Sequence, residues 1–308
     1  LERRKTTIML ALLFVRVCQK KKHLMERMMA VIAMTREMAT LGKDVASGLA
    51  DRLGLDVVHH EVVEHDIVRR SGLPESEVHR FLEGEASLLE RWRIDQRRLS
   101  NYTALEILEL AAKGNVLIRG WGATYLLRSV PHVMCVRLTA PMDFRTQVLM
   151  KRLSINDPSA ARREIERNDA AHNGTIQRLF GADWTDAALY AATLNTARIS
   201  PHDCVDYIER MVDNESFRET PESRANLADL LVDARVRSAL REYFGTRLNA
   251  VGMDIQVENC KVNISGAVSD DRVIADVIRH VNNVDGVLSV ESNIRHLSFS
   301  STAPASRD

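Results

Sequence analysis

Residues 35–55 read TREMATLGKDVASGLADRLGL, and this stretch decides how the rest of the chain is interpreted. A Walker A phosphate loop follows the spacing G-x-x-x-x-G-K-[ST], in which glycine lets backbone N–H groups surround phosphates and lysine reaches their outer oxygens. Gly42 and Lys43 stand at matching positions, whereas Glu37 replaces the first glycine and Asp44 replaces the hydroxyl residue. The stretch predicts an anion-binding turn at the start of a helix, with a solvated first-turn Lys43 as the alternative.

The segments around this loop follow the order that a phosphate loop requires. The apolar run AVIAMT precedes it as an expected strand, and Val45, Leu49 and Leu53 follow it at the four-residue spacing of one helix face. Near-continuous apolar runs of strand length recur between helical stretches, as is typical of a parallel sheet covered on both faces. These runs are 56–60, 115–120 and 132–140. The sequence therefore predicts an α/β domain over residues 29–216, with a parallel sheet flanked by helices.

Residues 141–183 are rich in arginine and have helical spacing. The stretches FRTQVLMKRL and ARREIERNDAAHNGTIQRLF carry Arg145, Arg152, Arg162, Arg163, Arg167 and Arg178. A solvated helix face is the simplest explanation for such a charge pattern. In an α/β domain with a phosphate loop, however, an arginine-bearing helical pair after the fourth strand favours a lid that closes over transferring phosphates.

The periodicity changes beyond the polar, proline-containing stretch FRETPESRA at 217–225, which we expect to be a linker. An amphipathic helix, two alternating strands, a second helix and a last strand follow, so residues 226–297 are predicted to form a separate α+β unit of order αββαβ. The polar tail 298–308 is expected to be disordered. Residues 1–28 hold a short apolar run interrupted by Arg16, which predicts an N-terminal extension outside the fold rather than a membrane span.

Composition narrows the functional classes. Lys+Arg and Asp+Glu are equal at 42 each among 308 residues, so no net charge favours nucleic acid as a partner. The four cysteines form no C-x-x-C pair, which argues against a disulfide framework or a zinc site and favours a cytoplasmic protein. The run HHEVVEH at 59–65 departs from the zinc motif H-E-x-x-H because Glu64 stands at the second histidine position.

Three stretches carry a resemblance to a known family: VIAMTREMATLGKDVASGLADRLGL, LIRGWGATYLL, and REIERNDAAHNGTIQRLFGADWTDAALYAATLNT. Met29 to about Val212 resembles the cytidylate kinase-like family of nucleoside monophosphate kinases, which have a P-loop fold. The chain departs from that family at the loop residues MATL, at His172 in the lid, and at GWGAT, where Trp121 stands at an arginine position. Residues 226–297 resemble a BON domain through ISGAVSD and GVLSVESNI, which implies lipid or small-ligand binding.

The loop pattern and the resemblance together imply a set of site residues. Lys43, Arg163 and Arg167 are the expected catalytic groups, and Asp44 could hold Mg²⁺ through its carboxylate. The expected ATP-binding residues are Thr35, Arg36, Gly42, Lys43, Asp44 and Arg152. The expected acceptor-binding residues are His60, Glu61, Arg119, Gly120, Trp121 and Asp169.

The resemblance implies transfer of the γ-phosphoryl group of ATP to a nucleoside monophosphate, with CMP or dCMP as the expected acceptor and ATP and Mg²⁺ as cofactors. The altered loop leaves a second hypothesis open, a nucleotide sensor without turnover that uses the BON-like unit as an interaction arm. A lipid-surface scaffold, led by the BON-like unit and the basic N-terminus, is a third.

Overall fold

The computed structural model describes residues 30–58, 65, 67–70, 72–82, 96–120, 122–245, 253–268 and 270–296. The N-terminal extension, the HHEVVE run, Trp121 and the C-terminal tail therefore lie outside the described residues. The chain divides into two units, Leu1–Arg224 and Ala225–Asp308, and each is considered by itself.

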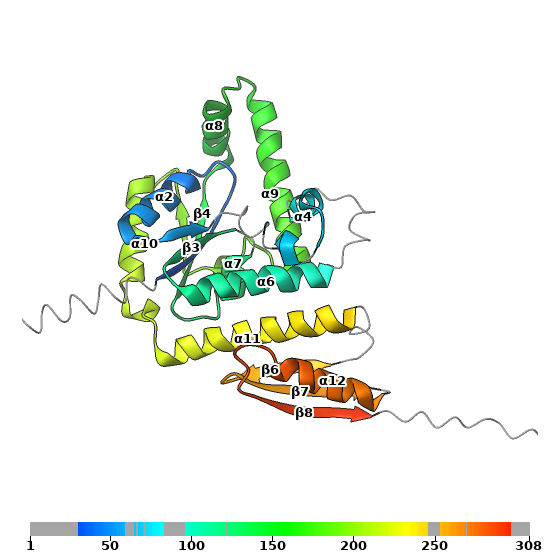
Figure 1. Ribbon diagram of the computed structural model, residues 1–308. Helices are drawn as coiled ribbons and strands as arrows, with labels where there is room; N and C mark the ends of the chain where they lie inside the picture. Colours follow the sequence, from blue (N-terminus) through cyan, green and yellow to red (C-terminus); the bar gives the residue numbers. More distant parts are fainter. Residues whose placement is uncertain are drawn as a thin grey trace, which may run out of the picture. The chain divides into compact units, whose positions relative to one another are not determined.

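The first unit is built on a five-stranded sheet of order β2-β3-β1-β4-β5 (Figure 1). All of its strand pairs are parallel, and the central strand β1 pairs with β3 on one side and β4 on the other. The strands are β1 (Val31–Arg36), β2 (Asp56–Val58), β3 (Val116–Arg119), β4 (Val133–Thr139) and β5 (Ala192–Asn195). The parallel α/β sheet predicted from the apolar runs is confirmed.

Helices cover both faces of this sheet. On one face, α2 (Gly42–Leu53) and α10 (Pro201–Val212) enclose a core with β1, β3 and β4 that includes Ile32, Leu49 and Ile208, each fully buried. On the other face lie α7 (Ala123–Leu127) and α6 (Gln96–Lys113). Apart from the hairpin that follows β4, the remaining described elements of this unit are α4 (Glu75–Leu82) and two short 3-10 helices, η1 (Ala187–Leu189) before β5 and η2 (Glu215–Phe217) after α10.

Two helices after β4 form a hairpin that projects from the carboxyl end of the sheet (Figure 1). They are α8 (Met142–Leu153) and α9 (Pro158–Phe180), so the helical spacing of the arginine-rich segment is confirmed. The turn between them follows from its sequence: Ser154 ends α8 in a left-handed conformation, and the Asp157 side chain caps α9 by accepting from the Ser159 N–H, with Pro158 in the first turn.

The second unit contains a three-stranded sheet of order β6-β7-β8. Its elements follow the predicted order αββαβ: α11 (Pro221–Phe244), β6 (Asp254–Glu258), β7 (Lys261–Val268), α12 (Asp271–Asn282) and β8 (Ser289–His296). β6 and β7 are antiparallel across a turn in which Asn259 and Cys260 both have positive φ, and the crossover through α12 makes β8 parallel to β7. Residues 221–225 of the expected linker are the first residues of α11. Among the helices described, none combines the length and apolar character that a membrane span requires.

Candidate functional site

The loop of residues 37–41 joins the end of β1 to the start of α2. Ala39 and Leu41 have φ values of 63° and 57°, a left-handed conformation that costs free energy for any residue other than glycine. Leu41 is the N-cap residue of α2, and its carbonyl accepts hydrogen bonds from the N–H groups of Asp44 and Val45. Turns that alternate in this way direct successive N–H groups toward one side, which makes an anion-binding concavity. A loop with Ala39 and Leu41, rather than glycine, at its left-handed positions therefore precedes α2 where the motif predicts a phosphate loop.

Gly42 and Arg36 are in close contact at the start of α2. A Cβ atom added to Gly42 would lie 2.4 Å from the Arg36 Cδ, so the absence of a side chain permits this approach. Lys43 and Asp44 follow in the first turn and are both exposed. The unpaired N–H groups of a first helical turn and the helix dipole favour an anion at this end. Four of the predicted ATP-binding residues are thus adjacent at the helix N-terminus.

Glu37, which occupies the first glycine position of the loop motif, is bonded to β4 and its extension. Its carboxylate accepts hydrogen bonds from Arg137 Nη2 at 2.6 Å, from Thr139 Oγ1 at 2.7 Å and from the Ala140 N–H at 3.2 Å. The loop motif identifies this residue only as the position of a lost glycine. In the structure it fixes the beginning of the loop to the neighbouring strand.

Asp169 on α9 is the second carboxylate that contacts the loop. Its Oδ1 accepts the Met38 N–H at 3.2 Å, and its Oδ2 accepts from Arg145 Nη1 at 2.5 Å. Arg145 Nε also lies 3.7 Å from the Glu37 carboxylate. The resemblance implied that Asp169 binds the acceptor, but in the structure its carboxylate is bonded to the loop and to Arg145.

Of the arginines expected to form the lid, Arg152, Arg163 and Arg167 face solvent on the hairpin, whereas Arg145 is buried. Arg163 and Arg167 have side chains that are 70% and 65% exposed, and Arg152 is exposed in the last turn of α8. The ion pairs described for the first two join them to carboxylates of the hairpin itself, Asp157 at 3.9 Å and Glu164 at 3.0 Å. The structure therefore places the solvent-facing arginines on one element, while the loop residues form a separate group.

The structure describes only some of the residues that are predicted to bind the acceptor. Arg119 ends β3, beside β1 in the sheet, and Gly120 follows it with φ of 83° and donates its N–H to the Met34 carbonyl at 3.0 Å. His60, Glu61 and Trp121 lie outside the described residues.

A small pocket of about 10 Å³ opens beside the carboxyl end of β1, and sequence analysis did not anticipate it. Its lining is mostly aromatic and hydroxyl-bearing: Thr35, Gly122, Thr124, Tyr125, His172, Ile176, Trp184, Leu189 and Tyr190. Thr35 is thus the one predicted ATP-binding residue that faces this pocket. Tyr190 donates its hydroxyl to the Trp184 carbonyl, and burial raises the pKa of Tyr190 to about 12, so the phenol stays protonated at neutral pH.

His172 is the pocket residue whose charge is most strongly affected by its surroundings. Its ring packs edge-on against Trp184 with the centroids 4.3 Å apart. Loss of solvent, together with the positive charge of Arg36, lowers the pKa of His172 to about 4. Where the family often has arginine, this chain therefore has a neutral imidazole at physiological pH.

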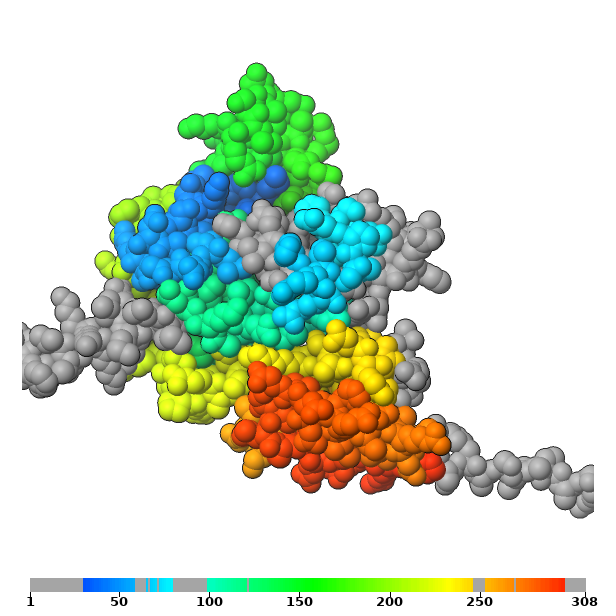
Figure 2. Space-filling model, in the orientation of Figure 1, coloured from blue at the N-terminus to red at the C-terminus, as the bar shows by residue number. Residues whose placement is uncertain are grey.

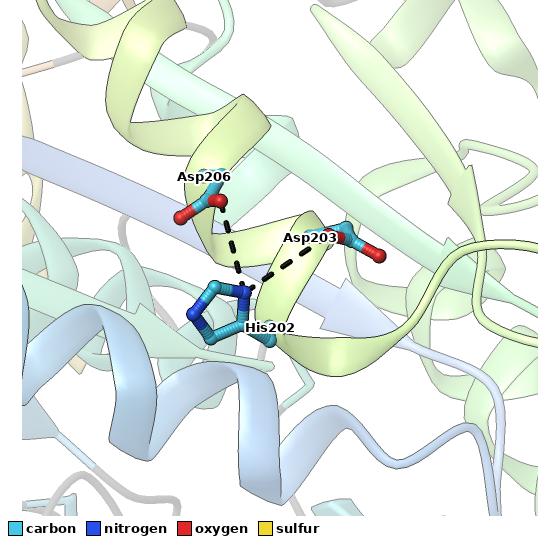
Figure 3. Close-up of side chains that lie close together, drawn as sticks. All are labelled: His202, Asp203 and Asp206. Carbon is cyan, nitrogen blue, oxygen red and sulfur yellow. Dashed lines mark ion pairs between the residues drawn. The ribbon is translucent and has the colours of Figure 1, made fainter.

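Among the described residues, His202, Asp203 and Asp206 form one group with the spacing of metal ligands, on α10 (Figure 3). A protein cation already lies there: Arg52, in the last turn of α2, pairs with Asp206 and lies 3.2 Å from Glu209. Its hydrogen bond to Asp206 is the main reason that the pKa of that carboxyl is lowered. The group is an ion-pair network at the end of α2 opposite the loop.

Comparison with known proteins gives a family match over more than half of the chain. Residues 31–198 match the model of the Cytidylate kinase-like family. A cytidylate kinase from Methanopyrus kandleri is 26% identical over 186 residues, which are 58% of this chain and 90% of that protein.

Likenesses to solved structures are more distant. An uncharacterized protein from Eubacterium ventriosum covers 60% of this chain and 98% of its own, at 18% identity and a TM-score of 0.49. A shikimate kinase from Acinetobacter baumannii, solved in complex with shikimate, covers 60% of this chain and 93% of its own, at 16% identity and a TM-score of 0.35. The fold assignment therefore rests on the sheet topology described above.

Proposed function

The chain belongs to the cytidylate kinase-like family, and from this premise we propose that its first unit transfers the γ-phosphoryl group of ATP to a nucleoside monophosphate, with CMP or dCMP as the acceptor. Membership of the family supports a nucleotide kinase-like function. The acceptor base and the residues that carry out the transfer belong to the proposal. Family membership favours the enzyme over the sensor hypothesis.

The loop between β1 and α2 is the observation that carries this proposal. Left-handed Ala39 and Leu41 shape the turn, Gly42 allows the helix to start against Arg36, and Lys43 stands exposed in the first turn. N–H groups of the loop and first turn would bind the β- and γ-phosphates of ATP, and the lysine ammonium would neutralise their outer oxygens. Phosphoryl transfer depends mainly on positioning and charge neutralisation, which these groups can provide.

Asp44 is the residue that fits a magnesium ion. Its carboxylate is exposed and directly follows Lys43, and carboxylate oxygens are ligands that a hard cation prefers. Asp44 would hold the ion, and the chemistry that the ion would supply is neutralisation of charge on the transferring phosphates. In the usual motif a hydroxyl takes this position, so Asp44 would hold the ion through a charged oxygen instead.

The hairpin arginines would act on the transferred group. Arg163 and Arg167 are four residues apart on α9 and thus share a helix face. Because Asp169, Ile165 and Ala161 of α9 already face the loop, the outer part of the hairpin would have to bend or turn for Arg163 or Arg167 to reach the moving phosphoryl group and stabilise its charge. Arg152 at the end of α8 would add a contact to ATP from the same element.

The acceptor would bind beside the carboxyl ends of β1 and β3, because ligands of parallel α/β sheets bind there. Arg119 and Gly120 lie at this edge, and His60, Glu61 and Trp121 are assigned to it by the family resemblance. Thr35 and the aromatic residues that line the small pocket lie near the same edge, where they would contribute to acceptor binding.

The second unit is proposed to be a BON-like module that binds a lipid or a small ligand. Its αββαβ order and its mixed sheet support this proposal.

A turnover assay with a panel of acceptors tests the proposed activity. ADP formation is followed with ATP, Mg²⁺ and each of CMP, dCMP, UMP, AMP and GMP. We expect acceptor-dependent ADP formation that is fastest with CMP or dCMP and lost on chelation of Mg²⁺. ADP formation that does not depend on any acceptor would show that the chain is not a monophosphate kinase.

A further inference from the structure

Two buried arginines and two half-buried carboxylates surround the back of the loop, and we call them the loop clamp: Glu37, Arg137, Arg145 and Asp169. Their side chains are 14%, 10%, 7% and 20% exposed. Two carboxylates and two guanidinium groups therefore offset one another in charge where water has limited access. Loss of one partner from such a group leaves an uncompensated buried charge, so each member depends on the others.

The first half of the clamp joins the loop to the sheet. The Glu37 carboxylate accepts from Arg137, Thr139 and Ala140, all at the end of β4, and the Glu37 N–H donates to the Leu138 carbonyl at 3.1 Å. The loop therefore begins as an extension of the β1–β4 pairing.

The second half joins the loop to the hairpin. Asp169 accepts the Met38 N–H, and Arg145, from α8, bonds Asp169 and lies 3.5 Å from the Met38 carbonyl oxygen. The two helices of the hairpin therefore each supply one side chain that bonds the backbone of the same loop residue, Met38. Arg145 also lies beside Glu37, which connects the two halves.

Apolar packing strengthens the same contact. Ala39 is buried in one cluster with Leu149, Ala161 and Ile165, which are residues of α8 and α9, and Met38 packs against that cluster. Part of the loop thus belongs to the hydrophobic core of the hairpin. Figure 2 shows the hairpin, in green, rising directly from the blue residues at its base.

We propose that Glu37 and Asp169 are positioning residues that fix the phosphate loop to the base of the α8–α9 hairpin, so that loop and hairpin base form one body. The left-handed conformations of Ala39 and Leu41 are unfavourable without glycine, and the clamp bonds to Glu37 and Met38, with the packing of Ala39, would offset part of that cost. The consequence for nucleotide binding rests on the proposed function. The loop would be held in its phosphate-binding conformation before ATP binds. The hydrogen bond from Met38 to Asp169 would connect the phosphate-binding residues to α9.

Amide hydrogen exchange without nucleotide tests the clamp directly. We compare the unmodified chain with Glu37→Gln, Asp169→Ala and Asp169→Asn, using Asp143→Ala as the matched control. Asp143 is an exposed carboxylate of the same hairpin, paired with Arg162 and not bonded to the loop. Exchange over residues 37–42 should rise about tenfold or more in Asp169→Ala, because a hydrogen bond in a charged network is lost. Asp169→Asn keeps an oxygen for the Met38 N–H, so its increase should be smaller, and the control and the α12 amides should not change.

A second measurement, MgATP affinity by calorimetry, tests positioning. Asp169→Ala and Glu37→Gln should raise the Kd for MgATP about tenfold, a loss of about 1.4 kcal/mol. In the acceptor assay, with ATP varied at saturating acceptor, kcat should change less than KM for ATP.

Unchanged exchange over residues 37–42 in both Asp169→Ala and Glu37→Gln would overturn the clamp, and so would an equal rise in Asp143→Ala. Faster exchange with unchanged ATP affinity would overturn the positioning role. If the unmodified chain binds no ATP, the proposed function fails, while the exchange measurement still decides whether the clamp exists.

Discussion

Lys43 is the single residue on which ATP binding should depend most. It is exposed in the first turn of α2, so its replacement removes charge and leaves the packing of the core unchanged. Lys43→Ala should weaken MgATP binding by about 1.5–3 kcal/mol, the usual range for a hydrogen bond to a charged group, with little change in Tm. Calorimetric titration measures this effect, and Lys113→Ala, an exposed lysine at the end of α6, is the control. Equal affinity in the two variants would mean that the loop does not bind phosphate.

His172 should make the stability of the first unit depend on pH. Its pKa is about 4 in the folded state against an ordinary value of 6.5, so the folded chain favours the neutral ring. The stabilisation is fully present above pH 6.5 and is lost as pH falls from 6.5 toward 4, up to about 3 kcal/mol.

Urea unfolding at pH 7 and pH 4.5 measures this dependence. His172→Gln should reduce the difference in unfolding free energy between the two pH values. A smaller difference should remain, because burial also lowers the pKa of His132. His202→Gln, at an exposed position, should behave like the unmodified chain. If His172→Gln leaves the difference in unfolding free energy between pH 7 and pH 4.5 unaltered, the lowered pKa of His172 is not its cause.

Residue types and spacing predicted the residues where the loop enters α2, but they did not predict the partners of the residues where the loop begins. Gly42, Lys43 and Asp44 follow from a motif that is local in sequence. The partners of Glu37 and Met38 lie 100 and 131 residues away, at Arg137 and Asp169. An arginine inside the apolar run HVMCVRLTA was a signal that a buried carboxylate must face that strand. Which carboxylate it is depends on the tertiary fold, so the sequence alone could not identify it.

The α8–α9 hairpin is the element whose role is most open to test. If the chain catalyses transfer, Arg163→Ala and Arg167→Ala should each lower kcat by about tenfold or more, a change of about 1.4 kcal/mol, with a smaller effect on ATP affinity. Both side chains are exposed, so stability should not change.

Arg162→Ala is the matched control for this prediction, because Arg162 precedes Arg163 on α9 and pairs with Asp143 across the hairpin. Steady-state kinetics at saturating acceptor distinguish the outcomes. If both Arg163→Ala and Arg167→Ala retain full kcat, these arginines have no role in the transfer and only form a solvated helix face.

Elements were predicted more completely than the contacts between them. Apolar runs located β1, β3 and β4 within about one residue at each end, since strands buried on both faces leave a strong local signal. The attachment of the hairpin to the loop was not predicted. It depends on Ala39 packing with Leu149 and Ile165, small and aliphatic residues that carry no distinctive pattern.

The whole chain should behave as two cooperative units. The second unit has its own core, which includes Val236, Val262 and Val277, and its own sheet. A fragment of residues 222–298 should therefore unfold cooperatively when it is expressed alone. Circular dichroism during heating measures this, and a spectrum without helix or strand would show that the unit requires the rest of the chain.

At the scale of the molecule, the central claim is that the loop at the start of α2 supports phosphoryl transfer to a monophosphate although it lacks the usual glycines. The most direct measurement is phosphorus NMR of the full chain incubated with ATP, Mg²⁺ and CMP. We predict that ADP and CDP appear in equal amounts, that Lys43→Ala forms both at least tenfold more slowly, and that Lys113→Ala forms both as the unmodified chain does. ADP accompanied by inorganic phosphate rather than CDP, or equal product formation by Lys43→Ala, would contradict this account.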